Sequence, residues 1–232
     1  MTRVLIIGGS AEAWRLARLL PEAAVHLAAP ERVPRNWPGQ VSRGPVSPAW
    51  LADLQVDRVV IAPHPCDAKA IAAALRAAQA VGVPFLNLMR PEWRASARDN
   101  WHPIRLAREA KTVIPQGARV LVTLGRDTLP HLNGLRAQCL VRQLGPPGGN
   151  FPLRHGRFLP ARGPFTVPHE LRFLRKERID WLLLRNAGGQ GGWPKLEAAR
   201  RLGIPVAMIQ RPRRPVGPIV TTPEEAMAWT KT

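Results

Sequence analysis

The stretch "RVLIIGG" at residues 3–9 returns as "RVLVTLG" at residues 119–125, at an offset of 116 residues in a chain of 232. A second pair, "AAQAVGVP" at 77–84 and "AARRLGIP" at 198–205, repeats at an offset of 121 residues. Landmarks that recur in the same order, half a chain apart, indicate two copies of one structural unit.

Both copies have the pattern of a parallel sheet. The repeated strands are continuous aliphatic runs, as is typical of strands buried on both faces, and "VDRVVIA" (56–62) and "IDWLLLR" (179–185) add another to each half. Strand–helix–strand alternation favours doubly wound α/β sheets with right-handed crossovers. We predict two similar Rossmann-like parallel-sheet domains, over residues 1–112 and 113–232, with a linker within 108–118 and a cleft between the domains.

The helices between these strands have recognisable ends. Asp67 is placed to cap a helix that Gly82 ends, and Pro194 stands in the first turn of a helix that Gly203 ends. Capping side chains and terminal glycines satisfy backbone groups that a helix leaves unpaired. Each copy is therefore predicted to carry one such helix between two strands.

The chain carries 34 Lys and Arg residues against 16 acidic ones, a formal charge of +18. This balance fits a polyanionic partner, an acidic membrane surface or a compositional bias toward arginine. The charge is uneven, because residues 128–169 contain no acidic residue. That stretch includes "GPPGGN" at 145–150 and is predicted to form a partly mobile basic wall. Its arginines are Arg136, Arg142, Arg154, Arg157 and Arg162.

Several features predict a cytoplasmic protein with no membrane segment. The apolar run before Gly8 is only four residues long, too short for a secretory signal, and no apolar stretch reaches membrane length. Cys66 and Cys139 lie far apart, which suits reduced thiols better than a disulfide framework. No zinc or P-loop spacing occurs, so no metal site is predicted.

In open parallel sheets, ligands bind beyond the carboxyl ends of the strands, where backbone amides and helix N-termini converge. Four loops follow predicted strands in this way: 8–10, 62–65, 123–126 and 186–193. The first is a weak match to a dinucleotide motif, because Ser10 replaces the second glycine of the motif. Its alternative interpretation is a tight turn that binds no nucleotide.

The loop at 186–193 carries the strongest signal. Lys195 follows it in the first helical turn, where a cation is unfavourable unless an anion binds there. The loop is therefore predicted to cradle a phosphate or carboxylate; the alternative is that Lys195 extends into solvent. Four of its residues let a flat or phosphorylated ligand approach the backbone closely: Gly188, Gly189, Gly191 and Gly192.

Two further side chains are candidates for ligand contacts. Arg126 follows Gly125 at a strand end and could bind the extra phosphate of NADP, unless it is an ordinary surface arginine. His64, held between Pro63 and Pro65, is either a hydrogen-bonding residue of the fold or a substrate contact.

Six segments of the chain together form a recognisable pattern: Gly8-Gly9-Ser10, Pro63-His64-Pro65, Arg90-Pro91-Glu92-Trp93, Thr123-Leu124-Gly125-Arg126, Gly163-Pro164-Phe165 with Glu170, and Arg185 through Pro212. Through these motifs the chain resembles the precorrin-6A reductase family of cobalamin biosynthesis, including its cobalt-precorrin relatives. The similarity covers nearly the whole length. It departs from the family pattern where Pro63 replaces a threonine, Arg185 a lysine and Ala187 a serine, and the lost hydroxyl makes position 187 a poor candidate for chemistry.

The resemblance implies an enzyme that reduces a ring double bond of precorrin-6A with NADPH to give precorrin-6B, by direct hydride transfer without flavin or metal. Its substrate, a polycarboxylate tetrapyrrole, gives the arginine-rich chain a small polyanion to bind. His64 is the candidate catalytic proton donor, with solvent or a ring nitrogen as equal alternatives. We assign the cofactor to C-terminal residues Gly125, Arg126, Arg185, Asn186, Gly188, Gly189 and Lys195. We assign the macrocycle to Gly9, Ser10, Arg90 and Trp93, although the two halves are similar enough to exchange these roles.

Two other functions remain as alternatives. A nucleotide-sugar transferase also has paired α/β domains, and a basic nucleic-acid-binding protein would use the positive charge. Against nucleic acid as a partner, the sequence contains no helix-turn-helix, RNP or zinc module.

Overall fold

The structure, a computed structural model, consists of two compact units. The first contains residues 1–91 and 212–232, and the second contains residues 92–211. This division differs from the predicted border at residue 112, because the chain returns to the first unit after it has built the second. The residues that the structure describes are 2–29, 31, 34–144 and 149–232.

Each unit is built on a sheet of six strands, and the neighbouring strands pair in parallel. The first sheet contains β1 (Val4–Gly8), β2 (Ala24–Leu27), β3 (Val41–Arg43), β4 (Arg58–Ile61), β5 (Phe85–Leu88) and β12 (Ile219–Val220). The second contains β6 (Trp101–Ile104), β7 (Arg119–Val122), β8 (Gln138–Leu144), β9 (Gly156–Ala161), β10 (Trp181–Arg185) and β11 (Val206–Ile209). The predicted fold class, two similar parallel-sheet α/β domains, is confirmed. The predicted cleft between them stays a prediction.

The two sheets have matching strand orders. The first is β12-β5-β4-β1-β2-β3 and the second is β6-β11-β10-β7-β8-β9. From the opposite edge, both follow the order 3-2-1-4-5-6 of doubly wound sheets. The repeated stretches of the sequence thus occupy equivalent places, with β1 and β7 each at the first position.

The sixth position of each sheet is filled from the other half of the chain. β6 follows β5 in sequence but pairs with β11, whereas β12 follows β11 but pairs with β5. The chain therefore crosses between the units twice, after Pro91 and after Arg211. The predicted linker at 108–118 instead lies inside the second unit, where it forms parts of η1 (Ala107–Glu109) and α4 (Ala110–Val113).

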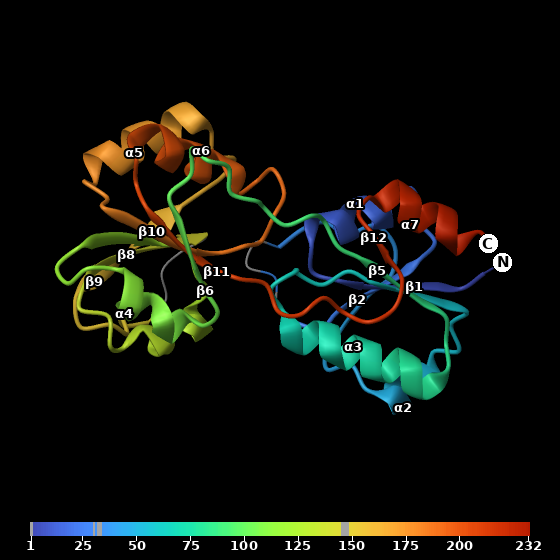
Figure 1. The fold of residues 1–232 in the computed structure, drawn as a ribbon. Coiled ribbons are helices and arrows are strands. Elements are labelled where there is room, and N and C mark those ends of the chain that lie inside the picture. Colours follow the sequence, from blue (N-terminus) through green and yellow to red (C-terminus); the bar gives the residue numbers. More distant parts are fainter. Residues whose placement is uncertain (1, 30, 32–33, 145–148) are drawn as a thin grey trace. The chain divides into compact units, whose positions relative to one another are not determined.

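Helices cover both faces of each sheet (Figure 1). In the first unit, α1 (Ala11–Leu19) contacts α7 (Pro223–Thr230), and α2 (Pro48–Asp53) contacts α3 (Ala68–Val81). Ile6 packs into the core on the α1 side, whereas Leu5 and Ile7 pack on the α3 side. Such alternation explains why β1 is apolar throughout.

The second unit has the same layers. α5 (Val167–Lys176) and α6 (Trp193–Leu202) lie together on one face, and η1 contacts the 3₁₀ helix η2 (Arg126–Leu132) on the other (Figure 1). Leu121 packs on the α6 side, and its neighbours Val120 and Val122 pack on the opposite side. η2 stands where the first unit has α1, and it contains Pro130, so the repeat is least regular here.

The predicted helix ends are confirmed. The carboxylate of Asp67 accepts a hydrogen bond of 3.0 Å from the Ala70 amide at the start of α3. Gly82 and Gly203 end α3 and α6 in the left-handed conformation, with φ angles of 73° and 67°. No helix in the described ranges is long and apolar enough to cross a membrane. The cytoplasmic location stays a prediction.

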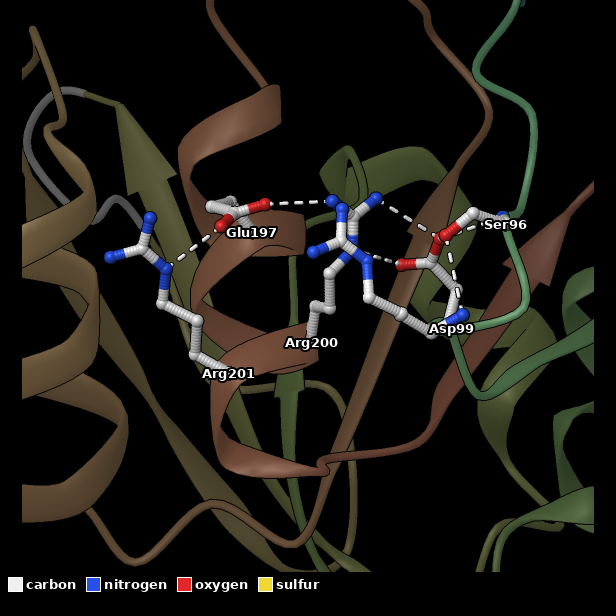
Figure 2. Close-up of polar contacts among 6 residues, drawn as sticks. Ser96, Asp99, Glu197, Arg200 and Arg201 are labelled. Atoms are coloured by element: carbon white, nitrogen blue, oxygen red, sulfur yellow. Dashed lines mark hydrogen bonds and ion pairs between the residues drawn. The ribbon is translucent and has the colours of Figure 1, made fainter.

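Asp99 fastens the segment that leads into the second unit to α6 (Figure 2). Its two carboxylate oxygens accept hydrogen bonds from Nε and Nη2 of Arg200, at 2.9 and 3.0 Å. The amide and hydroxyl of Ser96 each donate a further bond of 2.8 Å. Burial would raise the pKa of Asp99, but the hydrogen bonds from Arg200 and Ser96 outweigh burial and hold that pKa below its usual value. The carboxylate is therefore charged at neutral pH.

We predict that Asp99→Asn lowers the free energy of unfolding at neutral pH by about 1–3 kcal/mol, because Arg200 loses its buried counter-charge. The folded-state pKa of Asp99 is lowered, so the stabilisation is complete above the unfolded-state pKa and is lost as the pH falls through the folded value. Urea unfolding of variant and wild type at neutral and acid pH measures both effects.

The matched control is Arg201→Gln, which breaks an exposed pair with Glu197 on the same helix. Exposed pairs contribute under about 1 kcal/mol. Equal unfolding free energies for wild type and Asp99→Asn at neutral pH would contradict the prediction.

Candidate functional site

A glycine-rich turn joins β10 to α6, and we refer to residues 186–192 as the glycine loop. Gly188 and Gly189 have φ angles of 68° and 75°, in the left-handed region that glycine alone enters without strain. Gly191 has open space where a side chain would stand, with no atom within 4 Å. The loop thus combines two residues that must be glycine for backbone reasons with one that leaves room beside the backbone.

Trp93 is bound to the glycine loop at three points. Its amide donates to Oδ1 of Asn186 and its carbonyl accepts from Nδ2 of Asn186, both at 2.9 Å. Its indole Nε1 donates to the Gly189 carbonyl at 2.9 Å. A Cβ on Gly192 would lie 2.5 Å from the indole ring, so packing against Trp93 requires this glycine. Trp93 was predicted on the substrate side of the N-terminal half, but it lies in the second unit with this loop.

Two arginines support the glycine loop and the adjoining strand end. Arg211 donates from Nε to the Asn186 carbonyl at 2.8 Å and from Nη2 to the Ala187 carbonyl at 2.9 Å. Arg185 donates to the hydroxyl of Thr128 at 2.7 Å, which links the end of β10 to η2. No role was predicted for Arg211, although it lies within the matched stretch Arg185 through Pro212.

Lys195 turns toward the glycine loop. The side chain is half-buried, and its ammonium donates to the Gly192 carbonyl at 3.1 Å. Burial lowers the pKa of Lys195 to about 8; the charge of Glu170 raises this pKa and that of Arg142 lowers it. The lysine therefore does not extend into solvent as the alternative had it, and the predicted anion cradle stays a prediction.

The other cofactor candidates follow a neighbouring strand of the same sheet. β7 pairs with β10, so Gly125 and Arg126 lie at the same edge as Arg185. Gly125 precedes η2, and the exposed Arg126 donates from Nε to Oε1 of Gln143 at 2.8 Å. The guanidinium of Arg126 also lies 4.6 Å from the centre of the Phe158 ring. The seven residues predicted to bind the cofactor therefore all lie at the carboxyl ends of the strands of the second sheet.

In the first unit, the turn after β1 lies beside the loop after β4. Gly9 has a φ of 136°, and a Cβ there would lie 3.5 Å from backbone atoms of Pro63 and His64. Ser10 is buried and its hydroxyl caps α1 by accepting a bond of 3.0 Å from the Ala13 amide. The hydroxyl is thus used within the fold.

His64 and Arg90 are each oriented by a neighbour. Nδ1 of His64 accepts a bond of 3.2 Å from the Cys66 amide, so the neutral ring carries its proton on Nε2. Nη1 of Arg90 lies 2.6 Å from Oε2 of Glu12, in a pair whose side chains are 13% and 12% exposed. Glu12 was not among the predicted site residues, because its partner lies 78 residues away in the chain.

The predicted basic wall is only partly supported. Arg142 is buried in an ion pair with Glu170, so it belongs to no surface, and exposed Arg157 pairs with Glu177. Residues 145–148 of the wall lie outside the described residues. Arg136 and Arg154 line a cavity of about 1020 Å³ at the amino ends of β7, β8 and β9. The glycine loop lies at the opposite, carboxyl ends of the strands of this sheet. Within the described ranges, no three His, Cys, Asp or Glu residues are grouped to hold a metal.

We predict that Gly192→Ala lowers the free energy of unfolding by about 1–3 kcal/mol, because the new methyl group displaces the Trp93 indole from its contact with the loop. The matched control is Gly191→Ala, which enters open space and changes stability by less than about 0.5 kcal/mol. Urea unfolding of both variants measures the difference, and equal values would contradict the assigned packing of Trp93.

Comparisons with known proteins agree over the whole chain. The family described as "Precorrin-6x reductase CbiJ/CobK" matches residues 3–231. The precorrin-6A reductase of Rhodococcus erythropolis is 39% identical over 247 residues, which cover 100% of this chain and 98% of that protein. The precorrin-6A reductase of Rhodobacter capsulatus is 36% identical over 240 residues, with coverages of 99% and 96%.

A solved structure agrees with the sequence relatives. The structure described as "CobK precorrin-6A reductase" is 36% identical and has a TM-score of 0.90, over 100% of this chain and 97% of that chain. Sequence and fold therefore match along the same full length. This chain belongs to the precorrin-6x reductase CbiJ/CobK family.

Proposed function

We propose that this protein is an NADPH-dependent reductase that converts precorrin-6A to precorrin-6B in cobalamin biosynthesis. The observation that carries the proposal is the full-length similarity, at 39% and 36% identity, to two proteins named precorrin-6A reductase. Membership of the family favours this function over a nucleotide-sugar transferase or a nucleic-acid-binding protein.

The edge of the second sheet fits a phosphorylated dinucleotide. Gly188 and Gly189 keep side chains away from the turn, and Lys195 supplies a half-buried cation beside it. An anion is favourable at this helix start and would offset the unfavourable position of the lysine. Arg126 is exposed at the same edge, and its bond to Gln143 uses Nε rather than the terminal nitrogens that grip phosphate. When bound, NADPH supplies the hydride.

In this proposal the first unit holds the tetrapyrrole at the loops that follow β1, β4 and β5. Gly9 is exposed at the turn after β1, and the buried pair with Glu12 fixes the direction of Arg90. A guanidinium held in this way can bind a substrate carboxylate with little loss of side-chain entropy. Trp93, because it contacts the glycine loop, is reassigned to the cofactor side.

Reduction of a ring double bond also requires a proton at the second atom of the bond. In neutral His64, the bond from the Cys66 amide to Nδ1 leaves the proton on Nε2. His64 is therefore the candidate donor within the chain. Solvent and a ring nitrogen of the substrate remain the alternative proton sources.

We predict that the purified protein oxidises NADPH when precorrin-6A is added and yields a product heavier by two hydrogen atoms.

We further predict that Lys195→Ala raises the Kd for NADPH about tenfold to a hundredfold, the loss expected when one charge-assisted hydrogen bond to phosphate is removed. Absorbance, mass spectrometry and titration of nicotinamide fluorescence measure these effects.

The matched control is Lys176→Ala, which removes an exposed lysine from the adjoining helix α5. This variant is expected to bind NADPH like the wild type. A wild-type protein that leaves NADPH unoxidised in the presence of precorrin-6A would refute the proposed function, and equal Kd values for both lysine variants would refute the cradle.

We also predict that Arg126→Ala reduces the preference for NADPH over NADH at least about tenfold, because the extra phosphate of NADPH loses its guanidinium partner. The ratio of kcat/KM for the two cofactors is the measurement. Arg157→Ala, which removes an arginine of β9 that pairs with Glu177, is the control and leaves the ratio unchanged. A wild-type ratio in Arg126→Ala would place the phosphate elsewhere.

A further inference from the structure

Arg142 and Glu170 form a buried ion pair behind the glycine loop. Nη1 of Arg142, on β8, donates to Oε1 of Glu170, on α5, at 2.5 Å, and the two side chains are 5% and 0% exposed. The guanidinium lies 4.8 Å from the ring centre of Phe165 and 4.3 Å from that of Phe173. The two rings and the carboxylate hold the arginine in one place.

Each member of this pair has one buried polar atom that makes no hydrogen bond. Oε2 of Glu170 and Nη2 of Arg142 are buried and have no hydrogen-bond partner among the described residues. A buried carboxylate oxygen without a donor is costly, so such atoms normally have a neighbour that can reach them. The pair therefore has hydrogen-bonding capacity that its single hydrogen bond does not use.

Lys195, on the adjoining helix α6, has N–H donors that its own hydrogen bond does not use. Its ammonium carries three N–H groups, and the hydrogen bond to the Gly192 carbonyl uses one of them. α5 packs against α6 (Figure 1), and the charges of Glu170 and Arg142 both act on Lys195. No hydrogen bond joins Lys195 to Glu170, so Glu170 favours the charged form of this lysine through its charge alone.

The charges facing Lys195 come from α5 and β8. Glu170 stabilises the ammonium, whereas Arg142 and burial oppose it. The other charged or titratable side chains along this part of α5 are exposed: His169, Arg172, Arg175 and Lys176. Two cations and one carboxylate leave the cluster with a surplus positive charge, which an anion at the glycine loop would neutralise.

We propose that Glu170 is a positioning residue, whose buried carboxylate, fixed by Arg142, holds the ammonium of Lys195 charged beside the glycine loop. The anion that this ammonium receives is a phosphate group of the dinucleotide, and that identity rests on the proposed function. Without Glu170, the buried guanidinium of Arg142 would repel the half-buried ammonium of Lys195, and Lys195 would lose its proton.

The test measures the protonation of Lys195 in the full-length protein without any nucleotide. Acetic anhydride acylates only the unprotonated amine, and mass spectrometry of the Lys195 peptide follows the reaction over a pH series. For the wild type, the pH at which the acylation rate is half its maximum, here called the midpoint, is expected near the pKa of about 8. In Glu170→Gln the midpoint falls by about 1–3 pH units, whereas Glu170→Asp, which keeps the charge, restores most of the shift.

The matched control is Glu197→Gln, which removes a carboxylate from α6 that pairs instead with Arg200 and Arg201 (Figure 2). Its midpoint is expected to equal the wild-type value. Should Glu170→Gln fail to fold by circular dichroism, the double variant Glu170→Gln/Arg142→Gln removes both charges, and its midpoint lies between those of wild type and the expected single variant.

An unchanged midpoint in Glu170→Gln, or in the double variant, would overturn the inference whatever the protein does with NADPH. NADPH titrations over the same pH range test the proposed function separately. A shifted midpoint with unshifted NADPH affinity would uphold the role of Glu170 and remove the dinucleotide from the glycine loop. When both hold, NADPH affinity declines above the Lys195 midpoint, and in Glu170→Gln it declines at lower pH.

Discussion

The candidate cofactor site depends on one pairing, in which the side-chain amide of Asn186 binds the backbone of Trp93. An amide that accepts and donates at once matches the backbone N–H and C=O of one residue, so Asn186 acts as a strand partner would. This pairing fixes the first connection between the units to the glycine loop. Arg211 fixes the second connection to the same loop through two carbonyl groups. The loop is therefore the point in the second unit where both connections are attached.

Charge in this protein is organised by its few acidic residues. Against a surplus of +18, three buried or half-buried carboxylates each hold one arginine: Glu12 with Arg90, Glu170 with Arg142 and Asp99 with Arg200. Such pairs fix the position of an arginine at the expense of desolvation. A uniformly basic surface would bind any polyanion, whereas cations fixed in this way can distinguish one arrangement of anionic groups from another.

Local patterns in the sequence predicted most of the fold. The apolar strands, the cap at Asp67 and the terminal glycines at 82 and 203 depend on neighbours a few residues away, and the structure confirms them. The two units of the structure differ from the predicted border because β6 and β12 pair with strands far away in the sequence. β6 is four residues long and contains Pro103, which an edge strand tolerates but a pattern search passes over.

The candidate site shows the same limit. Gly188 and Gly189 were identified by type, and the cofactor candidates do share one sheet edge. Trp93 could not be placed, because its partners lie more than ninety residues along the chain. The sequence also does not show why position 192 is a glycine, because the Trp93 indole that leaves no room for a side chain there lies far away in the chain. Glu170 appeared in a motif, but its buried pairing with Arg142 is visible only in three dimensions.

The exchanged edge strands also set an order for folding during synthesis. Residues 92–211 are continuous, so the second unit has every strand of its sheet once Arg211 has been made. The first unit then still lacks β12, and its strand β5 presents an open edge until residues 219–220 arrive. An open edge can pair with another chain. The earlier half of the polypeptide thus finishes folding last, and its period of risk on the ribosome spans the synthesis of the entire second unit.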